Sequence, residues 1–121
     1  MKIAVIGSRD FPDKRLVIDY VNNLPEDTEV VTGGARGVDT WAEEAARVRG
    51  LSVRVFLPYF KRPGHKYFGH YAKWHFFARN DEIVDYCDRL VAFWDGRSKG
   101  TNDTIKKAQK KEKEVEIKAG R

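Results

Sequence analysis

The sequence predicts an α/β domain with three layers and a mainly parallel sheet of about five strands. Three apolar runs, residues 3–6, 30–32 and 90–93, each end in a loop rich in small residues, and a segment with helical periodicity follows each loop. Such a succession of buried strand, glycine turn and helix start forms anion sites, because the N–H groups of a helix N-terminus point at the anion. Parallel strands deliver these loops to one edge of the sheet, so we expect the three loops to lie together.

Hydrophobic periodicity places the individual elements along the chain. Strands are expected at residues 2–6, 29–32, 53–57 and 90–94, with a fifth, edge strand at 115–117. Helices are expected from about 13 to 24, from Thr40 to Gly50, around 79–86 and from Thr101 onwards. This alternation makes a single Rossmann-like three-layer domain over residues 1–121, with a basic C-terminal end from about residue 106.

Two of the predicted helices have recognisable N-terminal signals. Thr40 and Glu43 fit a capping box, and Gly50 stops the helix that they open. The buried face of that helix is expected to contain Trp41, Ala42, Ala45 and Val48. Thr101 is expected to cap the last helix, with Asp103 in its first turn, where an acid favours the helix dipole.

Composition excludes several classes of protein. The hydrophobic fraction of 41% and the aromatic fraction of 12% are ordinary for a folded globular chain. No apolar run approaches the roughly 20 residues of a membrane span, and no signal-peptide pattern is present, so we expect a cytoplasmic protein without a membrane partner. Cys87 is the only cysteine, which excludes an internal disulfide, and we expect it to be a buried small side chain.

The net charge of +5 includes an unusual central block. Residues 51–80 contain six Arg or Lys, no Asp or Glu, and nine of the fifteen aromatic residues. Basic and aromatic residues in alternation suit stacking on nucleic-acid bases, and they are equally typical of an aromatic core face followed by a loop. His65, His70 and His75 also lie in this block, but no nearby cysteine or carboxylate completes a metal site, so we expect no metal.

Four motifs together resemble the signatures of a known superfamily. They are Gly7-Ser8-Arg9-Asp10-Phe11, Gly33-Gly34-Ala35-Arg36-Gly37-Val38-Asp39, Arg79-Asn80 and Trp94-Asp95-Gly96-Arg97-Ser98-Lys99-Gly100-Thr101. The chain resembles the SLOG superfamily, which unites the DNA-processing protein Smf/DprA with the Lonely Guy cytokinin-activating enzymes, and it is most similar to the small YspA/YpsA-related group. The resemblance implies a Rossmann-like fold and a site for a nucleotide or nucleotide-derived ligand.

The loops supply the candidate ligand contacts. Ser8 offers a hydroxyl, and Arg9 can pair with a phosphate or form a surface ion pair with Asp10. Arg36 adds a fork of donors, and Asp39 can accept from a ribose hydroxyl or cap the following helix. The expected ligand-binding residues are Gly7, Ser8, Arg9, Gly33, Gly34, Arg36, Gly37, Asp39, Arg79, Asn80, Trp94, Gly96, Ser98, Gly100 and Thr101. The second loop lacks the lysine of a Walker A motif and departs from the pattern G-x-G-x-x-G.

The last loop also bears on catalysis. In the Lonely Guy enzymes the related segment reads P-G-G-x-G-T-x-x-E, and its glutamate takes part in hydrolysis of an N-glycosidic bond. Aligning Gly100-Thr101 with G-T puts Thr104 in place of that glutamate, and a threonine cannot act as a carboxylate acid or base. The catalytic candidates that remain are Arg36, Asp39, Arg79 and Asp95.

Three functions are therefore open. The favoured one is binding of a phosphorylated nucleotide-type ligand, of the nucleoside phosphate or ADP-ribose class, by a sensor that needs no cofactor. The second is a phosphoribohydrolase-like enzyme acting on nucleoside monophosphates. The third is a single-stranded nucleic-acid binder that uses residues 51–80. Exposed aromatic residues also leave a homodimer or a higher homo-oligomer open.

Overall fold

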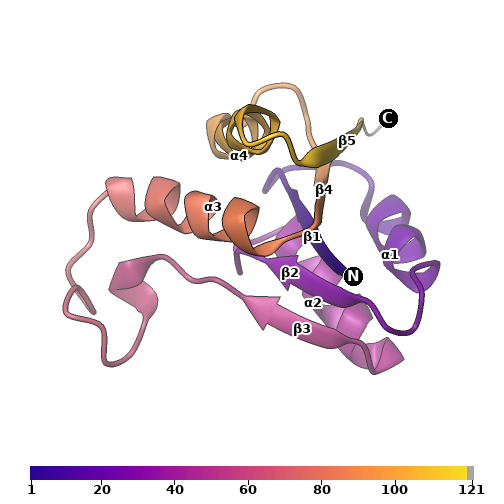
Figure 1. Ribbon diagram of the computed structural model, residues 1–121, viewed down its shortest axis with the longest axis horizontal. Helices are drawn as coiled ribbons and strands as arrows, with labels where there is room; N and C mark the ends of the chain where they lie inside the picture. The colour runs from indigo at the N-terminus through magenta and orange to yellow at the C-terminus, as the bar shows by residue number, and fades with distance from the viewer. Residues whose placement is uncertain (120–121) are drawn as a thin grey trace.

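Five parallel strands form one sheet in the computed structural model, which describes residues 1–119 (Figure 1). The strands are β1 (Lys2–Gly7), β2 (Glu29–Thr32), β3 (Ser52–Val55), β4 (Arg89–Phe93) and β5 (Glu114–Lys118). Their order across the sheet is β3-β2-β1-β4-β5, and every neighbouring pair is parallel. The predicted fold class is confirmed, and the predicted strands all form.

Helices cover both faces of the sheet. The first face is covered by α1 (Lys14–Asn22) and α2 (Val38–Arg49), the second by α3 (Trp74–Tyr86) and α4 (Lys99–Lys110). Strand alternation explains the division: in β1, Ile3 and Val5 belong to the core under α1 and α2, and Ala4 and Ile6 belong to the core under α3 and α4. Cys87 is buried in the second core, as expected. No helix in the described part of the chain is long and apolar enough to cross a membrane.

The helix α2 begins differently from the prediction. Gly37 is its N-cap residue and no side chain caps it, so the capping box expected at Thr40 is wrong. The Thr40 hydroxyl instead donates to the carbonyl of Ala35 at 2.7 Å. Val48 is 89% exposed and lies off the buried face, contrary to expectation. The buried residues of α2 are Val38, Asp39, Ala42, Ala45 and Ala46.

The helix α3 begins at Trp74, five residues before the expected start near Arg79. The aromatic run at residues 74–77 hides the helical period, because both faces of the first turn carry large rings. Arg79 and Asn80 therefore lie in the middle of the helix and not at its start.

The helix α4 is capped by Ser98 and not by Thr101, which corrects the second capping prediction. The Ser98 Oγ accepts a hydrogen bond from the Thr101 N–H at 3.4 Å. The helix consequently starts at Lys99, and Asp103 lies beyond its first turn.

Residues 59–73, called the arm below, project past the N-terminal end of α3 (Figure 1). The arm contains the 3-10 turn η1 (Tyr59–Lys61) followed by several tight turns. Arg62 anchors its base, since the guanidinium pairs with Glu82 of α3 and Nε donates to the carbonyl of Leu57 at 2.7 Å. Of the aromatic residues in the acid-free block, Phe56 is the one that joins the buried core under α3 and α4 within residues 1–119.

Gly7 lies where β1 meets both β4 and α2, and this contact leaves no room for a side chain. A Cβ atom here would stand 2.7 Å from Val38 Cγ2 and also against the carbonyl oxygen of Phe93. We expect Gly7→Ala to lower the free energy of unfolding by about 1–3 kcal/mol through overpacking. In the control Gly100→Ala, the new Cβ meets nothing within 4 Å, so stability should stay level or rise by up to about 1 kcal/mol. Urea unfolding measures both variants, and wild-type stability of Gly7→Ala would contradict this packing.

Candidate functional site

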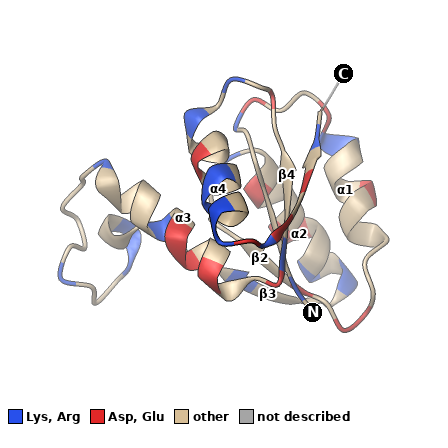
Figure 2. Ribbon diagram, turned by 45° about the horizontal axis from the view of Figure 1, so that its top comes forward, with Lys and Arg blue, Asp and Glu red and all other residues tan. Residues whose placement is uncertain are grey.

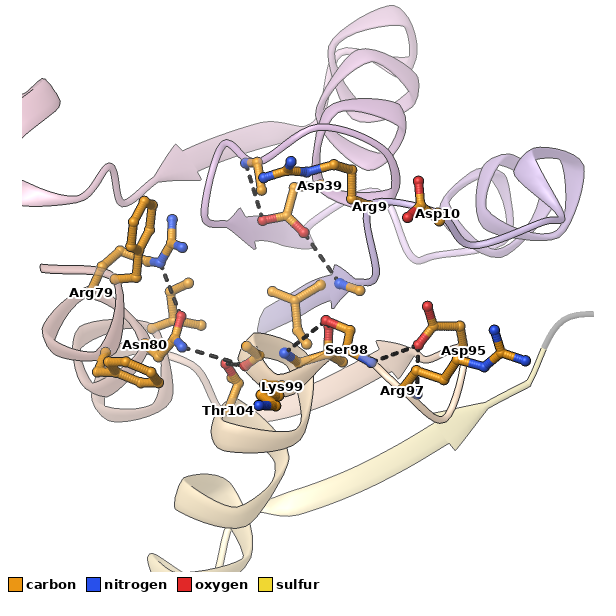
Figure 3. A pocket seen from close by; sticks show the side chains of 18 of the residues that line it. Arg9, Asp10, Asp39, Arg79, Asn80, Asp95, Arg97, Ser98, Lys99 and Thr104 are labelled. Atoms are coloured by element: carbon orange, nitrogen blue, oxygen red, sulfur yellow. Dashed lines mark hydrogen bonds between the residues drawn. The ribbon is translucent and has the colours of Figure 1, made fainter. Parts of the chain in front are cut away.

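A cleft of about 830 Å³ opens at the carboxyl edge of the sheet, beside α3 (Figure 3). Its walls come from the loops after β1, β2 and β4, from α3 and from the first turns of α4. The strand order reverses at β1, because β2 and β3 lie on one side of it and β4 and β5 on the other. Open α/β sheets bind ligands in the crevice at such a switch point.

The structure brings together many of the residues selected from the sequence, but not all. Those that line the cleft are Gly7, Arg9, Asp39, Arg79, Asn80, Asp95, Ser98, Gly100 and Thr101. Those that do not line it are Ser8, Gly33, Gly34, Arg36, Gly37, Trp94 and Gly96. Ser8 is only 1% exposed, and its Oγ accepts the N–H of Asp95 at 3.1 Å, which ties the loops after β1 and β4 together. The Trp94 indole donates to the carbonyl of Ser98 at 3.0 Å.

Asp39 cross-links the loops after β1 and β2. Its buried carboxylate accepts the N–H groups of Gly7 at 3.2 Å, Gly33 at 2.9 Å and Ala35 at 3.4 Å. These bonds go to the neighbouring loops and not to the first turn of its own helix. Burial raises the pKa of Asp39 to about 6, and the nearby Arg79 and the three N–H donors oppose that rise.

Two glycines of the second loop are required for the packing of the protein's own atoms. A Cβ on Gly33 would lie 2.7 Å from Arg79 Nη1 and 2.9 Å from Asp39 Oδ2, so glycine leaves the space in which these two side chains meet the loop. Gly37 has a φ of 79° and its Cβ position lies against the backbone of Arg9. Only glycine adopts that backbone conformation without strain, so the β1 loop can approach the start of α2.

Arg79 and Asn80 are buried in the wall that α3 contributes. Arg79 donates through Nη1 to the carbonyl of Gly33 and through Nε to Asn80 Oδ1 at 3.0 Å. Asn80 Nδ2 donates to Asp103 Oδ2 at 3.1 Å, which ties α3 to α4. Burial lowers the pKa of Arg79, and Asp39 opposes that effect. The Nη2 of Arg79 forms no hydrogen bond within residues 1–119, so this residue of the cleft wall keeps an available donor.

The N-terminus of α4 is partly occupied by the protein's own Asp95. Its Oδ1 accepts the N–H groups of Arg97 and Ser98, both at 2.8 Å, and these bonds lower the pKa of Asp95. The N–H groups of Lys99 and Gly100 have no acceptor within the described residues. These two groups are the helix-end donors that an anion can use.

Thr104 lies at the cleft, at the position where the resemblance placed a glutamate. Its side chain is 3% exposed, and its hydroxyl donates to the carbonyl of Gly100 at 3.1 Å. The hydroxyls of Ser98 and Thr101 lie 3.2 Å apart and share a hydrogen bond. The three hydroxyls therefore serve the first turns of α4.

Sequence reasoning missed most of a basic rim and an aromatic wall. The cleft-lining residues outside the selected set include Asp10, Lys73, Phe76, Phe77, Arg97 and Lys99. Five basic and three acidic side chains line the cleft in total, and Figure 3 shows Arg9 on one side of it and Arg97 and Lys99 on the other. The signal for the wall is helical spacing over residues 73, 76, 77, 80 and 83, which becomes visible only once α3 starts at Trp74. No ion pair joins Arg9 to Asp10 within residues 1–119.

The histidines of the central block do not form a metal site. Within residues 1–119 no group of three His, Cys, Asp or Glu side chains is arranged to hold a metal ion. His75 is 1% exposed and is surrounded by aromatic rings, with ring centres 4.3 Å away for Trp74 and 5.1 Å away for Tyr67. Burial lowers the pKa of His75, which favours the neutral ring.

The Asp39 cross-link predicts a pH dependence of stability. The folded-state pKa of about 6 lies above the usual 3.8, so the native state holds this proton more tightly than the unfolded chain. The resulting stability is fully present below about pH 4 and is lost as pH rises through about 6. Asp39→Asn cannot titrate, so the stability of wild type relative to this variant should fall between about pH 4 and 7. Urea unfolding across this range measures the difference, and a constant difference would contradict the buried-carboxylate account.

Solved structures with this fold include DNA processing protein A (DprA) from Streptococcus pneumoniae, with a TM-score of 0.80 and 24% identity. That match covers 96% of this chain and 49% of the DprA chain, so this chain spans about half the length of that protein. The structural genomics target TM1055 has a TM-score of 0.75 and 22% identity, covering 94% of this chain and 71% of that one. DprA from Helicobacter pylori, described for its single-stranded DNA binding mode, has a TM-score of 0.72 and 26% identity, covering 97% of this chain and 64% of that one.

Membership of a family rests on the first half of the sequence. No curated protein matches the chain significantly. A family model does match residues 1–62, just over half of the 121 residues, and this segment contains the loops after β1 and β2 that Asp39 joins. The chain therefore belongs to the YspA, cpYpsA-related SLOG family.

Proposed function

We propose that the cleft binds a small phosphorylated ligand of nucleotide type, such as a nucleoside phosphate or an ADP-ribose derivative, and that the protein senses this ligand without hydrolysing it. One observation carries the proposal: a cationic helix N-terminus and an aromatic wall share one cleft at the switch point of the sheet. Membership of a SLOG family supports a ligand of this chemistry, as does the single-stranded DNA binding of the H. pylori structural relative.

The anionic part of the ligand is assigned to the first turn of α4. The N–H groups of Lys99 and Gly100 are available there, and the helix dipole favours a negative charge at this end. Arg9 and Arg97 are exposed at the rim and can add charge-assisted hydrogen bonds to phosphate oxygens. Because Asp95 occupies two neighbouring N–H groups, the phosphate uses the donors that Asp95 leaves free.

The nucleobase is assigned to the wall formed by α3. Phe76 and Phe77 line the cleft and are only half-buried, so their rings retain accessible surface. The Arg79 guanidinium lies 5.9 Å from the Phe76 ring centre, and its Nη2 can donate to a base nitrogen or a ribose oxygen. Stacking of a base on an aromatic side chain is worth about 1–3 kcal/mol, enough to favour nucleotides over plain phosphate.

Hydrolysis needs a carboxylate free to exchange a proton with the ligand. Three carboxylates line the cleft: Asp39 and Asp95 already accept backbone N–H groups, and Asp10 is exposed to solvent. Both oxygens of Asp39 accept backbone N–H groups, Asp95 Oδ1 accepts two more, and Thr104 donates to a carbonyl. We therefore expect purified protein to release no free base from the four common ribonucleoside monophosphates. Chromatography after prolonged incubation measures this, and release that disappears in Asp10→Asn, Asp39→Asn or Asp95→Asn would contradict the binding-only role.

Gly100 gives a direct test of the phosphate position, because a Cβ there meets nothing within 4 Å. Gly100→Asp puts a carboxylate where the phosphate is expected, so it should weaken binding of AMP or ADP-ribose at least about tenfold. The stability of this variant should be kept, because an acid is favourable at a helix N-terminus. Gly100→Asn has the same shape without the charge and should bind within about threefold of wild type.

Isothermal titration calorimetry measures these affinities, and thermal unfolding without ligand confirms that both variants fold. Equal affinities of the Asp and Asn variants would contradict the phosphate position. Failure of wild type to bind any member of a panel of nucleotides and ADP-ribose derivatives would overturn the proposed function itself.

A further inference from the structure

The arm exposes large aromatic side chains that the cleft does not use. Phe68 and Tyr71 are 52% and 67% exposed, and Trp74, directly after the arm, is 48% exposed. None of these three residues lines the cleft or belongs to the two hydrophobic cores of residues 1–119. Neither the fold nor the cleft therefore accounts for their exposure.

The arm is also cationic and free of acids. Residues 51–80 contain no Asp or Glu, and Figure 2 shows blue and tan segments in the arm but no red. Lys61 and Lys66 are exposed and lie 5.8 Å and 5.1 Å from the ring centres of Phe60 and Tyr67. Neither lysine has a carboxylate partner within residues 1–119. The arm therefore combines positive charge with aromatic surface.

An inner cluster of rings holds two of the exposed ones, Tyr71 and Trp74, in place. Tyr71 packs edge-on against Phe60, with ring centres 5.1 Å apart. Trp74 packs edge-on against Tyr59 at 5.7 Å and Tyr67 at 5.4 Å. The pair of Arg62 with Glu82 fixes the base of the cluster to α3. Tyr71 and Trp74 are thus preorganised, which reduces the entropy that a partner must spend on ordering them.

We propose that the arm binds single-stranded nucleic acid, whose bases stack on Phe68, Tyr71 and Trp74 while Lys61 and Lys66 neutralise its phosphates. An acid-free cationic surface suits a polyanion, and exposed flat rings suit unpaired bases. A duplex hides the faces of its bases, so the aromatic residues favour a single strand. A membrane-binding element would present an amphipathic helix, whereas the arm consists of η1 and tight turns.

This surface adjoins the cleft but is separate from it. Phe76 lines the cleft and also contacts Tyr71 of the arm, with ring centres 6.0 Å apart. Lys61, Lys66 and Phe68 line no part of the cleft. Binding at the arm therefore does not rest on the proposed function of the cleft, and each can be tested without the other.

Charge reversal tests whether the arm carries the binding. Replacing Lys61 and Lys66 by Glu should weaken binding of a labelled oligo-dT of about 20 nucleotides at least about tenfold, and should reduce the slope of log K against log salt by about 1.4. The matched control replaces Lys106 and Lys110, which are exposed on α4, by Glu. It makes the same change in net charge and should alter the affinity less than about threefold. Fluorescence anisotropy over a salt series measures all three proteins.

A single truncation tests the stacking. Phe68 has no aromatic neighbour among the described ring pairs, so Phe68→Ala should leave the fold intact. It should weaken oligo-dT binding at least about fivefold, because one stacked base is lost. Val48→Ala removes apolar surface that is 89% exposed on α2 and should have no effect.

The outcomes separate the alternatives. Four results would each overturn the proposal. The two lysine double variants could weaken oligo-dT binding equally, or Phe68→Ala could bind oligo-dT as tightly as wild type. The protein could also bind a duplex more tightly than a single strand, or bind phosphatidylserine vesicles in place of oligo-dT. The arm variants should keep their affinity for AMP or ADP-ribose, and Gly100→Asp should keep its affinity for oligo-dT. If the wild type binds oligo-dT but no nucleotide, the proposed function of the cleft is wrong. If it binds a nucleotide but not oligo-dT, the proposal for the arm is wrong.

Discussion

The geometry of the cleft depends on one buried carboxylate. Parallel pairing brings the loops after β1 and β2 to the same edge of the sheet, but backbone pairing ends with the strands. Asp39 continues the connection by accepting N–H groups from both loops. Arg79 reaches the same place from α3 and donates to the carbonyl of Gly33. The carboxylate and the guanidinium therefore hold two loops and a helix around one space, and Gly33 is small enough to let them do so.

The fold could be predicted because its determinants are local and repetitive. Each strand is a short run of apolar residues, and the strand at residues 29–32 was predicted with the bounds that the structure shows. The start of α3 could not be found in this way, because its first turn carries large rings on more than one face. Trp74 packs against the arm, whereas Phe76 and Phe77 line the cleft, so no single apolar face marks the helix. The capping positions were wrong for a related reason. Thr40 and Thr101 have the right chemistry for caps, but Gly37 and Ser98 occupy the positions where the chain turns into each helix.

The position of the candidate site in the fold could be predicted better than the residues that line it. Glycine-rich loops mark where the backbone must pass close to something, and sequence does not say whether that is a ligand or the protein itself. Gly7, Gly33 and Gly37 make room for neighbouring protein atoms, whereas Gly96 and Gly100 face open space. The side chains that the loops did not reveal, Phe76 and Phe77 above all, come from α3, which follows the third strand and the arm. Their relation to the loops is tertiary, so no local pattern contains it.

Asp95 gives the cleft a property that an open helix N-terminus lacks. Its carboxylate already holds the N–H groups of Arg97 and Ser98, so a fixed negative charge lies next to the free N–H groups of Lys99 and Gly100. A phosphate bound to those two free groups would be repelled by the neighbouring carboxylate, and the net gain in free energy from the anion contact alone would be small. Binding would then be readily reversible and would follow the concentration of the ligand. The same repulsion keeps the helix end from binding ordinary inorganic anions tightly, because they bring no base whose stacking would offset it.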